Sequence, residues 1–407
     1  MRKKAVTPKR ATTRSQAFVP GSMPVKVRPD SWVLMPALVL LSIGIVMVGS
    51  ASIAIAEGLG VAPYHYLARH LVFIFMGVVL AMSLRIIPMA FLQRISQPLA
   101  LLSILMLGLV LVPGLGHEVN GSTRWIRLGF VNFQVIEAVK LLVIIYVAGY
   151  LARKADLVQT RFFDTFKPLM FAGLLSVILF MQPDMGSAVV ITAIVAGMVW
   201  LAGAAWRHFF VLGLLALPVF GYAAMEPYRL RRITGFLDPW ADPYGVGFQL
   251  TQALIAVGRG ELFGAGIGAS IQKLFYLPEA HTDFIFAVLA EELGLLGVIF
   301  VLALFLLLVT RIMVIGMMAH RKGRTFSGFV AYGIGLWIGL QALVNIGVNL
   351  GVLPTKGLTL PLISSGGSSM LMILVAIGVV LRIKYELDRD FGVYEKSRAP
   401  LKKGATA

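Results

Sequence analysis

Apolar stretches long enough to cross a lipid bilayer recur along most of the chain, and this repetition limits the folds that it can adopt. A spanning helix needs about 17 to 25 mostly apolar residues to cross about 30 Å of hydrocarbon. About ten such windows can be placed, approximately at 32–54, 70–87, 98–114, 133–152, 168–183, 186–203, 208–225, 284–310, 328–350 and 369–385. The sequence therefore predicts an all-α polytopic integral membrane protein with about ten transmembrane helices.

Composition excludes several other classes of protein. Of the 407 residues, 58% are hydrophobic, whereas soluble globular proteins reach about 45 to 50%. The chain has no cysteine, so disulfides and thiolate metal sites are excluded. The net charge of +17 lies mainly in tails and in loops beside the spans. Basic residues there set orientation and attract anionic lipid headgroups, so we do not expect nucleic-acid binding.

The basic residues also predict the orientation of the chain. Residues 1–30 hold eight Lys or Arg and lack the apolar core of a cleavable signal peptide, which predicts a disordered cytoplasmic tail. With this end inside, most other basic residues also fall inside, so both termini are predicted to be cytoplasmic. A transmembrane domain at 31–385 then precedes a cytoplasmic tail at 386–407. Residues 226–282, between the seventh and eighth spans, form the large extracytoplasmic loop.

Three carboxylates, those of Asp283, Glu291 and Glu292, occur at the start of the eighth apolar window. An ionised Asp at bilayer depth costs roughly 2.5 to 3.5 kcal/mol on insertion scales, so it should face a cavity, a partner charge or a reacting group. At about 100° per residue, Glu291 falls about 80° from Asp283, and Glu292 falls on the opposite face. At most one of them can share its cavity. Asp283 itself fits an N-cap and a catalytic base equally well.

Further polar candidates lie around the third and fourth predicted spans. Arg124 stands beside Trp125 in the outer connection at 115–132, as in surfaces that grip anionic headgroups or anchor a chain at the membrane interface. Glu137 and Lys140 are three residues apart on one helical face and can pair. That pair either neutralises two costly charges, or Lys140 faces a pyrophosphate site.

The large outer loop is rich in arginine where the positive-inside rule predicts few basic residues. Arg229, Arg231 and Arg232 lie just outside the seventh span, which indicates an anionic ligand. A short amphipathic piece with Gln249 and Gln252 follows. The later glycines of this loop match no dinucleotide fingerprint, because no strand precedes them, so no organic cofactor is expected.

Two other outer connections also carry polar residues. Asp184 follows the fifth span and suits the N-cap of the sixth, supported by Ser187, better than it suits catalysis. Residues 352–369 mix apolar residues with Ser and Gly and are typical of a re-entrant stretch, tolerated at membrane depth only against protein or a watery cavity. Lys356 is the only charge there. It either contacts a lipid headgroup or binds a ligand.

Five motifs together resemble the SEDS family (shape, elongation, division and sporulation) over about residues 31–385. They are RWI at 124–126, QPDMG at 182–186, YRLRR with FLDPW at 228–240, LPEAHTDFIFAVLAEELG at 277–294 and PTKGLTLPLISSGGSS at 354–369. The long basic N-terminal tail is more similar to the cell-division branch of that family than to the elongation branch. The chain departs at 134–137, which reads Gln-Val-Ile-Glu where the family usually has Gln-Pro-Ser-Glu.

The resemblance implies a peptidoglycan glycosyltransferase that polymerises lipid II on the outer face of the inner membrane during septal wall synthesis. Asp283 aligns with an essential acidic residue and would activate the acceptor's 4-hydroxyl. Attack on the donor's anomeric carbon would expel undecaprenyl pyrophosphate with inversion and make a β-1,4 linkage. Lys356, Arg124, Lys140 and a divalent cation, Mg or Mn, would hold the pyrophosphate. The other substrate-binding candidates are Glu137, Arg229, Gln249, Thr282, Ser364 and Ser365.

The resemblance also implies a class B penicillin-binding protein as partner, the septal transpeptidase, along with other divisome proteins. Its single span would pack in an apolar groove between outward spans. Ser270 and Lys273 have Ser-x-x-Lys spacing, but the companion transpeptidase motifs are absent, so crosslinking must come from another chain. The alternatives are a flippase for the same lipid and a division scaffold without chemistry. A transporter needs access from both sides, whereas the polar residues here gather on the outer side.

Overall fold

The computed structural model describes most of the chain between residues 29 and 398. The described residues are 29–119, 122–128, 131–211, 213–214, 221, 225 and 234–398. The chain divides into two units, one of residues 29–384 and one of residues 1–28 and 385–407. Of the predicted tails, residues 1–28 and 399–407 lie outside the described residues, whereas 386–398 belong to the last helix, Gly367–Arg398. The predicted domain division stays a prediction.

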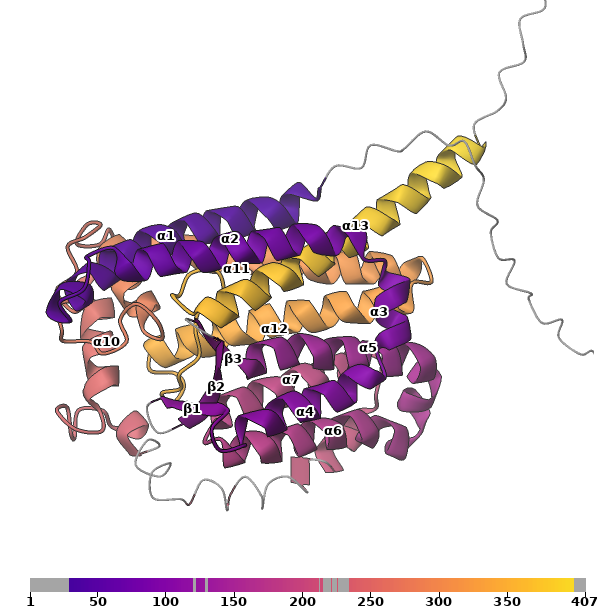
Figure 1. Ribbon diagram of the computed structural model, residues 1–407, viewed down its shortest axis with the longest axis horizontal. Coiled ribbons are helices and arrows are strands. Elements are labelled where there is room, and N and C mark those ends of the chain that lie inside the picture. The colour runs from indigo at the N-terminus through magenta and orange to yellow at the C-terminus, as the bar shows by residue number, and fades with distance from the viewer. Residues whose placement is uncertain are drawn as a thin grey trace, which may run out of the picture. The chain divides into compact units, whose positions relative to one another are not determined.

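The described part of the chain is largely helical (Figure 1). Its helices are α1 (Ser31–Gly58), α2 (His65–Ser83), the 3-10 helix η1 (Leu84–Ile86), α3 (Met89–Ile95), α4 (Pro98–Val110), α5 (Val135–Thr160), α6 (Phe162–Met181), α7 (Met185–Leu201), α10 (Phe248–Arg259), α11 (Ile285–Arg321), α12 (Thr325–Asn349) and α13 (Gly367–Arg398). Six of them are long and apolar enough to cross a membrane, or seven if α3 and α4, bent by 69°, form one span. The predicted seventh window, 208–225, lies largely outside the described residues.

Helix α12 lies at the centre of the helical packing. It packs against α5, α7 and α11, and its Trp337 is fully buried. Close approach to α11 depends on small residues, because a side chain at Gly316 would meet the ring of Tyr332 at 2.6 Å and the carbonyl of Gly328 at 3.1 Å. Membrane helices commonly use such small residues where their backbones meet. Helix α12 therefore places its side chains against several neighbouring helices.

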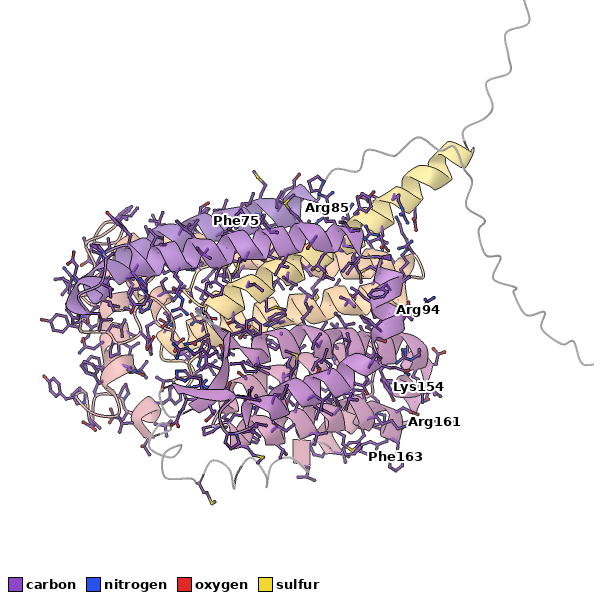
Figure 2. The ribbon with its side chains drawn as sticks, viewed as in Figure 1. Phe75, Arg85, Arg94, Lys154, Arg161 and Phe163 are labelled. Carbon is purple, nitrogen blue, oxygen red and sulfur yellow. The ribbon has the colours of Figure 1, made fainter. Side chains whose placement is uncertain are left out.

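Several basic residues lie toward the same end of the helices. Figure 2 shows Arg85, Arg94, Lys154 and Arg161 toward one end of the helices, whereas the sheet and α10 lie toward the other end (Figure 1). On α2, Phe75 is 70% exposed, as expected for a ring that faces lipid. The end with the basic residues is the one that the sequence places inside the cell.

A small β-sheet corrects the prediction of an all-α protein. Strands β1 (Gly116–Val119), β2 (Ser122–Leu128) and β3 (Val131–Gln134) form an antiparallel sheet in the order β1-β2-β3. The sheet packs against α4 and α5. Asn120-Gly121, between β1 and β2, is a strong hairpin signal, and its position in a connection between apolar windows explains why the pattern of spans did not reveal it.

Helix α11 is interrupted where the preceding loop inserts its backbone. Gly294 has φ 65° and ψ −168°, a conformation that glycine adopts without steric cost. The amide of Ala265 donates to the carbonyl of Glu291 at 2.9 Å, and the amide of Leu295 donates to the carbonyl of Glu261 at 2.9 Å. The backbone groups freed by the break are therefore paired with the loop, as burial requires.

Irregular backbone between α12 and α13 is packed inside the protein. Leu360, Leu362 and Ile363 are at most 1% exposed. The segment lies directly on α1, since a side chain at Gly44 would meet the carbonyl of Leu362 at 2.6 Å. The backbone predicted to be irregular at 352–369 is nonhelical through Gly366, whereas residues 367–369 belong to α13. Its Leu360–Ile363 part is covered by protein, as such backbone requires at membrane depth, and re-entry into the membrane stays a prediction.

Candidate functional site

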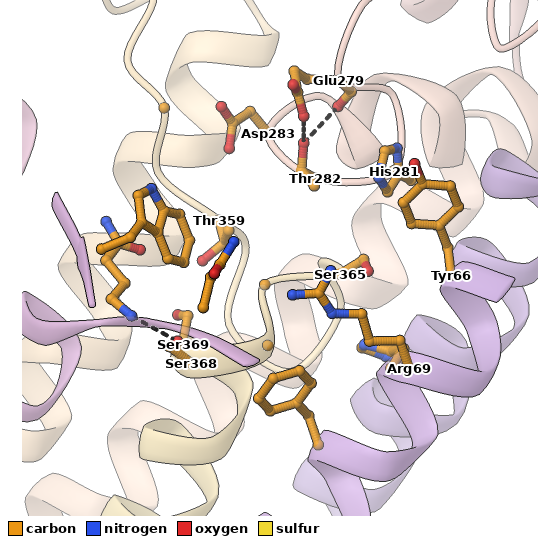
Figure 3. A pocket seen from close by; sticks show the side chains of 18 of the residues that line it. Tyr66, Arg69, Glu279, His281, Thr282, Asp283, Thr359, Ser365, Ser368 and Ser369 are labelled. Atoms are coloured by element: carbon orange, nitrogen blue, oxygen red, sulfur yellow. Dashed lines mark hydrogen bonds between the residues drawn. The ribbon is translucent and has the colours of Figure 1, made fainter. Parts of the chain in front are cut away.

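A cavity of about 300 Å³ lies between α2, the sheet, the loop before α11 and the segment before α13 (Figure 3). Its lining is Tyr66, Arg69, His70, Phe73, Arg124, Trp125, Asn132, Gln134, Glu279, His281, Thr282, Asp283, Gly357, Thr359, Ser365, Gly366, Gly367, Ser368 and Ser369. Aromatic rings, hydroxyls and charged groups of both signs thus face one space. Such a mixture is typical of a site for a ligand with polar and apolar parts.

Asp283 faces this cavity and is not the N-cap of α11. The N-cap position belongs to Phe284, whose side chain makes no cap hydrogen bond, so the N-cap interpretation of Asp283 is wrong. The backbone before it is held from the 364–365 turn: the Ser365 amide donates to the His281 carbonyl at 3.0 Å. The Ser364 hydroxyl donates to the Thr282 carbonyl at 2.6 Å. These bonds fix the loop on which Asp283 stands.

The residues around Asp283 form a tight turn against α2. The Thr282 hydroxyl donates to Glu279 Oε2 at 2.6 Å, and Glu279 has a positive φ of 56°. The His281 ring lies 4.8 Å from the Tyr66 ring, centroid to centroid. Burial lowers the pKa of His281, and the nearby Glu279 carboxylate only partly opposes this. The His281 imidazole is therefore neutral at pH 7 and packs as an aromatic group.

Two guanidinium groups share the cavity with Asp283. Arg124 comes from β2, and its Nη1 lies 3.6 Å from Asp184 Oδ1. Asp184 caps α7, because its carboxylate accepts from the Ser187 amide at 3.1 Å and from the Ser187 hydroxyl at 2.7 Å; the N-cap prediction is confirmed. Arg69 comes from α2, with its guanidinium carbon 5.9 Å from the centroid of the Phe73 ring. The site thus presents cations that suit a phosphate-bearing ligand.

Glu137 and Lys140 pair with each other and lie apart from the cavity lining. Lys140 Nζ donates to Glu137 Oε1 at 2.8 Å and to Gln341 Oε1 at 2.7 Å. Lys140 is 1% exposed and stands 5.1 Å from the centroid of the Trp337 ring. The predicted pairing is confirmed, whereas contact with a pyrophosphate stays a prediction that this position does not favour.

The remaining predicted substrate residues fall in different places. Ser365 and Thr282 line the cavity, whereas Ser364 is buried behind it. Lys356 precedes the cavity residue Gly357, and its Nζ lies 3.5 Å from Met185 Sδ. Gln249 lies on α10, outside the cavity lining, and Arg229 lies outside the described residues.

Glu291 and Glu292 are each paired with one cation, from α10 or from the loop before α11, and do not line the cavity. Glu291 Oε1 accepts from Arg259 Nη1 at 2.7 Å. Glu292 Oε1 accepts from Lys273 Nζ at 2.7 Å and from the Ser50 hydroxyl at 2.7 Å. Neither glutamate lines the cavity of Asp283. This agrees with the prediction from helical angles that at most one of them could do so. Lys273 is engaged by Glu292, which supports the view that the Ser-x-x-Lys spacing is a chance match.

The described residues supply no protein-only metal site. Within them, no group of three or more His, Cys, Asp or Glu residues is placed to hold a metal ion. Mg²⁺ commonly binds through one or two carboxylates together with substrate phosphates. Asp283 and Glu279 are the carboxylates of the cavity, so the predicted divalent cation would have to share its coordination with the ligand.

Sequence reasoning missed the cavity residues of α2. Tyr66, Arg69 and His70 lie at or just before the start of the second predicted window, which treated them as a boundary. Arg69 and His70 beside an apolar run are a signal that could have found them, because ionisable residues at membrane depth usually mark a functional site. These residues of α2 share a cavity with Asp283 only because distant parts of the chain pack together.

Comparison with known proteins gives one consistent result. The family model FTSW_RODA_SPOVE, described as cell cycle protein, matches residues 31–389. A protein of Coxiella burnetii named probable peptidoglycan glycosyltransferase FtsW is 50% identical over 360 residues, covering 88% of this chain and 97% of that protein. A protein of the same name from Nitrosococcus halophilus is 50% identical over 369 residues, covering 90% and 94%.

Solved structures agree with the sequence relatives. A chain of a peptidoglycan synthase complex, described as coordinating polymerization and crosslinking, has a TM-score of 0.71 and 31% identity, and the match covers 88% of this chain and 98% of that one. The rod shape determining protein RodA of Thermus thermophilus has a TM-score of 0.66 and 30% identity, covering 89% and 98%. The chain therefore belongs to the FtsW/RodA/SpoVE family of cell cycle proteins, the SEDS family.

Proposed function

We propose that this protein is a septal peptidoglycan glycosyltransferase that polymerises lipid II into β-1,4 glycan strands. The observation that carries the proposal is the position of Asp283 in a cavity that also contains Arg69 and Arg124. The names of the relatives support the same reaction, since those at about 50% identity are called probable peptidoglycan glycosyltransferases. A carboxylate facing two guanidinium groups suits a reaction that expels a diphosphate.

In the proposed reaction, Asp283 acts as general base on the 4-hydroxyl of the acceptor sugar. The proton moves to the carboxylate as the oxygen attacks the anomeric carbon of the donor. A new carbon–oxygen bond forms, and the bond from the anomeric carbon to undecaprenyl pyrophosphate breaks. A single displacement from the opposite side inverts the anomeric centre. General base catalysis of this kind is worth about 10²- to 10⁴-fold in rate.

The diphosphate leaving group needs positive charge as the bond breaks. Arg124 and Arg69 supply it directly from the cavity wall, and Lys356 lies next to the cavity residue Gly357. Guanidinium groups match phosphate oxygens in a bidentate way. A divalent cation brought with the diphosphate would neutralise further charge, held by Asp283 and Glu279.

The proposal includes the placement of the enzyme in the inner membrane at the division septum. Ten crossings with both termini in the cytoplasm would put the cavity on the extracytoplasmic side, with the large loop between helices 7 and 8. The basic residues at the opposite end of the helices support this orientation (Figure 2). A class B penicillin-binding protein is the proposed partner, since a similar chain was solved in a peptidoglycan synthase complex.

The test uses purified protein reconstituted with its candidate transpeptidase and labelled lipid II. Glycan polymer is compared on a gel for the native protein, for Asp283→Asn and for Glu57→Gln, which removes an exposed carboxylate of α1 that does not line the cavity. We expect polymer from the native protein and from Glu57→Gln, and none from Asp283→Asn.

The other results would redirect the proposal. Polymer from Asp283→Asn as well would keep the glycosyltransferase but remove Asp283 as its base. Absence of polymer from every form, despite a folded and stable complex, would favour a flippase or a scaffold. A lipid-flipping assay on the same vesicles would then separate those two functions.

A further inference from the structure

Three amide side chains recur every four residues along α12 and are fully or almost fully buried. Gln341 and Asn349 are 0% exposed and Asn345 is 1% exposed. Because four residues make about one helical turn, the three amides form one line on the helix. We call Gln341, Asn345 and Asn349 the amide stripe. Buried polar groups persist where they are hydrogen-bonded, so their partners show what the stripe is for.

Asn345 joins the two segments that carry the candidate chemistry. Its Nδ2 donates to the carbonyl of Asp283 at 2.8 Å. The same nitrogen donates to the carbonyl of Leu358 at 2.6 Å. An amide nitrogen has two hydrogens, so both are used. One side chain thus sets the Asp283 loop in register with the segment that contains Lys356 and Gly357.

Asn349 joins Asp283 to the first turn of α11. Its Nδ2 donates to the carbonyl of Asp283 at 3.0 Å. Its Oδ1 accepts from the amide of Ala287 at 3.0 Å. The first amides of a helix lack partners one turn earlier within the helix. The Phe284 side chain provides none, and its carbonyl shares the Ala287 amide with Asn349, at 3.0 Å. Asn349 therefore caps α11 from a neighbouring helix and holds Asp283 against that cap.

Gln341 extends the same line to the cavity residues Thr359 and Ser369. Its Nε2 donates to the carbonyl of Thr359 at 3.0 Å and to the hydroxyl of Ser369 at 3.2 Å. Its Oε1 accepts from Lys140 Nζ at 2.7 Å. Apart from Lys140 on α5, the partners of the stripe outside α12 are thus residues of the site or of the segments next to it.

We propose that Asn345 and Asn349 are positioning residues for the reaction of Asp283. Both amides bind its backbone carbonyl, and neither lines the cavity. They fix where the carboxylate stands without touching the ligand. This inference rests on the proposed glycosyltransferase function. Substitution of either asparagine should therefore lower kcat with little change in KM, because a misplacement of the reacting group by about 1 Å can cost on the order of 10²-fold in rate.

The kinetic test measures kcat and KM for lipid II in the reconstituted complex. We expect Asn345→Ala and Asn349→Ala each to lower kcat on the order of 10- to 100-fold, with KM unchanged within about threefold. Asn345→Gln, which keeps the donor hydrogens, should recover part of the loss. The matched control is Ser176→Ala, which removes a partly buried hydrogen bond to Thr192 between α6 and α7, away from the cavity.

A second measurement does not depend on activity. The chain has no cysteine, so Pro278→Cys and Thr355→Cys can carry the only two spin labels in the protein. Pulsed electron spin resonance then reports the distance between the Asp283 loop and the 354–369 segment. We expect Asn345→Ala to broaden this distance distribution, and Ser176→Ala to leave it as in the labelled protein without further change.

Two results would overturn the positioning role. One is a distance distribution that Asn345→Ala leaves unchanged. This result would overturn the positioning role even in a preparation without polymerase activity. The other is a kinetic result without a specific loss in kcat. Either the asparagine variants lose no more kcat than Ser176→Ala does at the same shift in melting temperature, or their whole loss is a rise in KM. An inactive native protein with a broadened distribution in Asn345→Ala would instead count against the glycosyltransferase proposal alone.

Discussion

The carboxylates near the start of α11 lie in two different environments. Asp283 lies in the cavity, facing the space into which Arg69 and Arg124 also project. Glu291 and Glu292, about two turns further on, are at most 1% exposed and bind cations from α10 and from the loop before α11. We call Glu291, Glu292, Arg259 and Lys273 the paired-carboxylate cluster.

The difference shows that a charged residue near a membrane helix end can serve two purposes. In the paired-carboxylate cluster, ion pairs and the inserted loop backbone hold the break in α11 at Gly294. Around Asp283, the hydrogen bonds go to backbone carbonyls of the loop, and the carboxylate faces the cavity. One region is built for rigidity, and the other presents a reactive group on a rigid support.

The largest expected effect separates the two regions by activity. Asp283→Asn should lower the rate of polymerisation by about 10²- to 10⁴-fold, the usual worth of a general base. Its melting temperature in detergent should stay within about 2 °C of the native protein, because the change preserves shape and removes a charge at an open cavity. Rates come from labelled lipid II and stability from thermal unfolding. A folded variant with native rates would contradict the division into two regions.

The next effect is on stability and belongs to the paired-carboxylate cluster. Lys273→Met leaves the buried Glu292 carboxylate without its cation, and breaking a buried pair costs about 3 to 5 kcal/mol. Thermal unfolding should show the loss, and the double variant Lys273→Met with Glu292→Gln should regain most of it. If the single and double variants had the same melting temperature, the pair of Lys273 and Glu292 would not be what holds the loop before α11.

A smaller effect should distinguish two arginines of the same strand. Arg124→Met removes a cation from the cavity wall and should lower kcat/KM about 10-fold or more, since a hydrogen bond to a charged group contributes about 1.5 to 3 kcal/mol. Arg127→Met, also on β2, changes an exposed residue that does not line the cavity and should leave kcat/KM native. Equal losses in both variants would point to the sheet rather than to a phosphate contact.

The smallest effect is a pH dependence of stability that arises at His281. Burial lowers its pKa in the folded protein, so below about pH 6.5 the unfolded chain binds more protons. Stability should therefore fall as the pH drops below that value, by at most about 1.4 kcal/mol per pH unit. His281→Phe keeps a ring against Tyr66 and should flatten this dependence between pH 6.5 and 5.5. If the melting temperatures of the native protein and of His281→Phe fell equally as the pH dropped, the acid sensitivity would belong to other groups.

Several features of the site followed from sequence because they depend on local patterns. The cap formed by Asp184 and Ser187 lies within four residues, and the pair of Glu137 and Lys140 lies within one helical turn. Asp283 was found because a carboxylate beside an apolar run is costly. Its interpretation as an N-cap failed because α11 begins two residues later and is capped by Asn349 from another helix.

Contacts between distant segments explain what local patterns could not predict. Arg69 meets Asp283 in one cavity although more than 200 residues separate them in the chain. Asn345 looks like an ordinary polar residue in an apolar window until its partners, Asp283 and Leu358, are known. The sheet was missed because its strands are only four to seven residues long.

The sequence alone determined that this chain is a helical membrane protein, which family it resembles, and that Asp283 is its most unusual carboxylate. These conclusions rest on hydropathy, on motif spacing and on the cost of charge in hydrocarbon, all of which are local properties. Only the tertiary structure decided which charged groups face a cavity and which are paired. That choice depends on desolvation and on partners brought together by helix packing, and a linear pattern does not specify either.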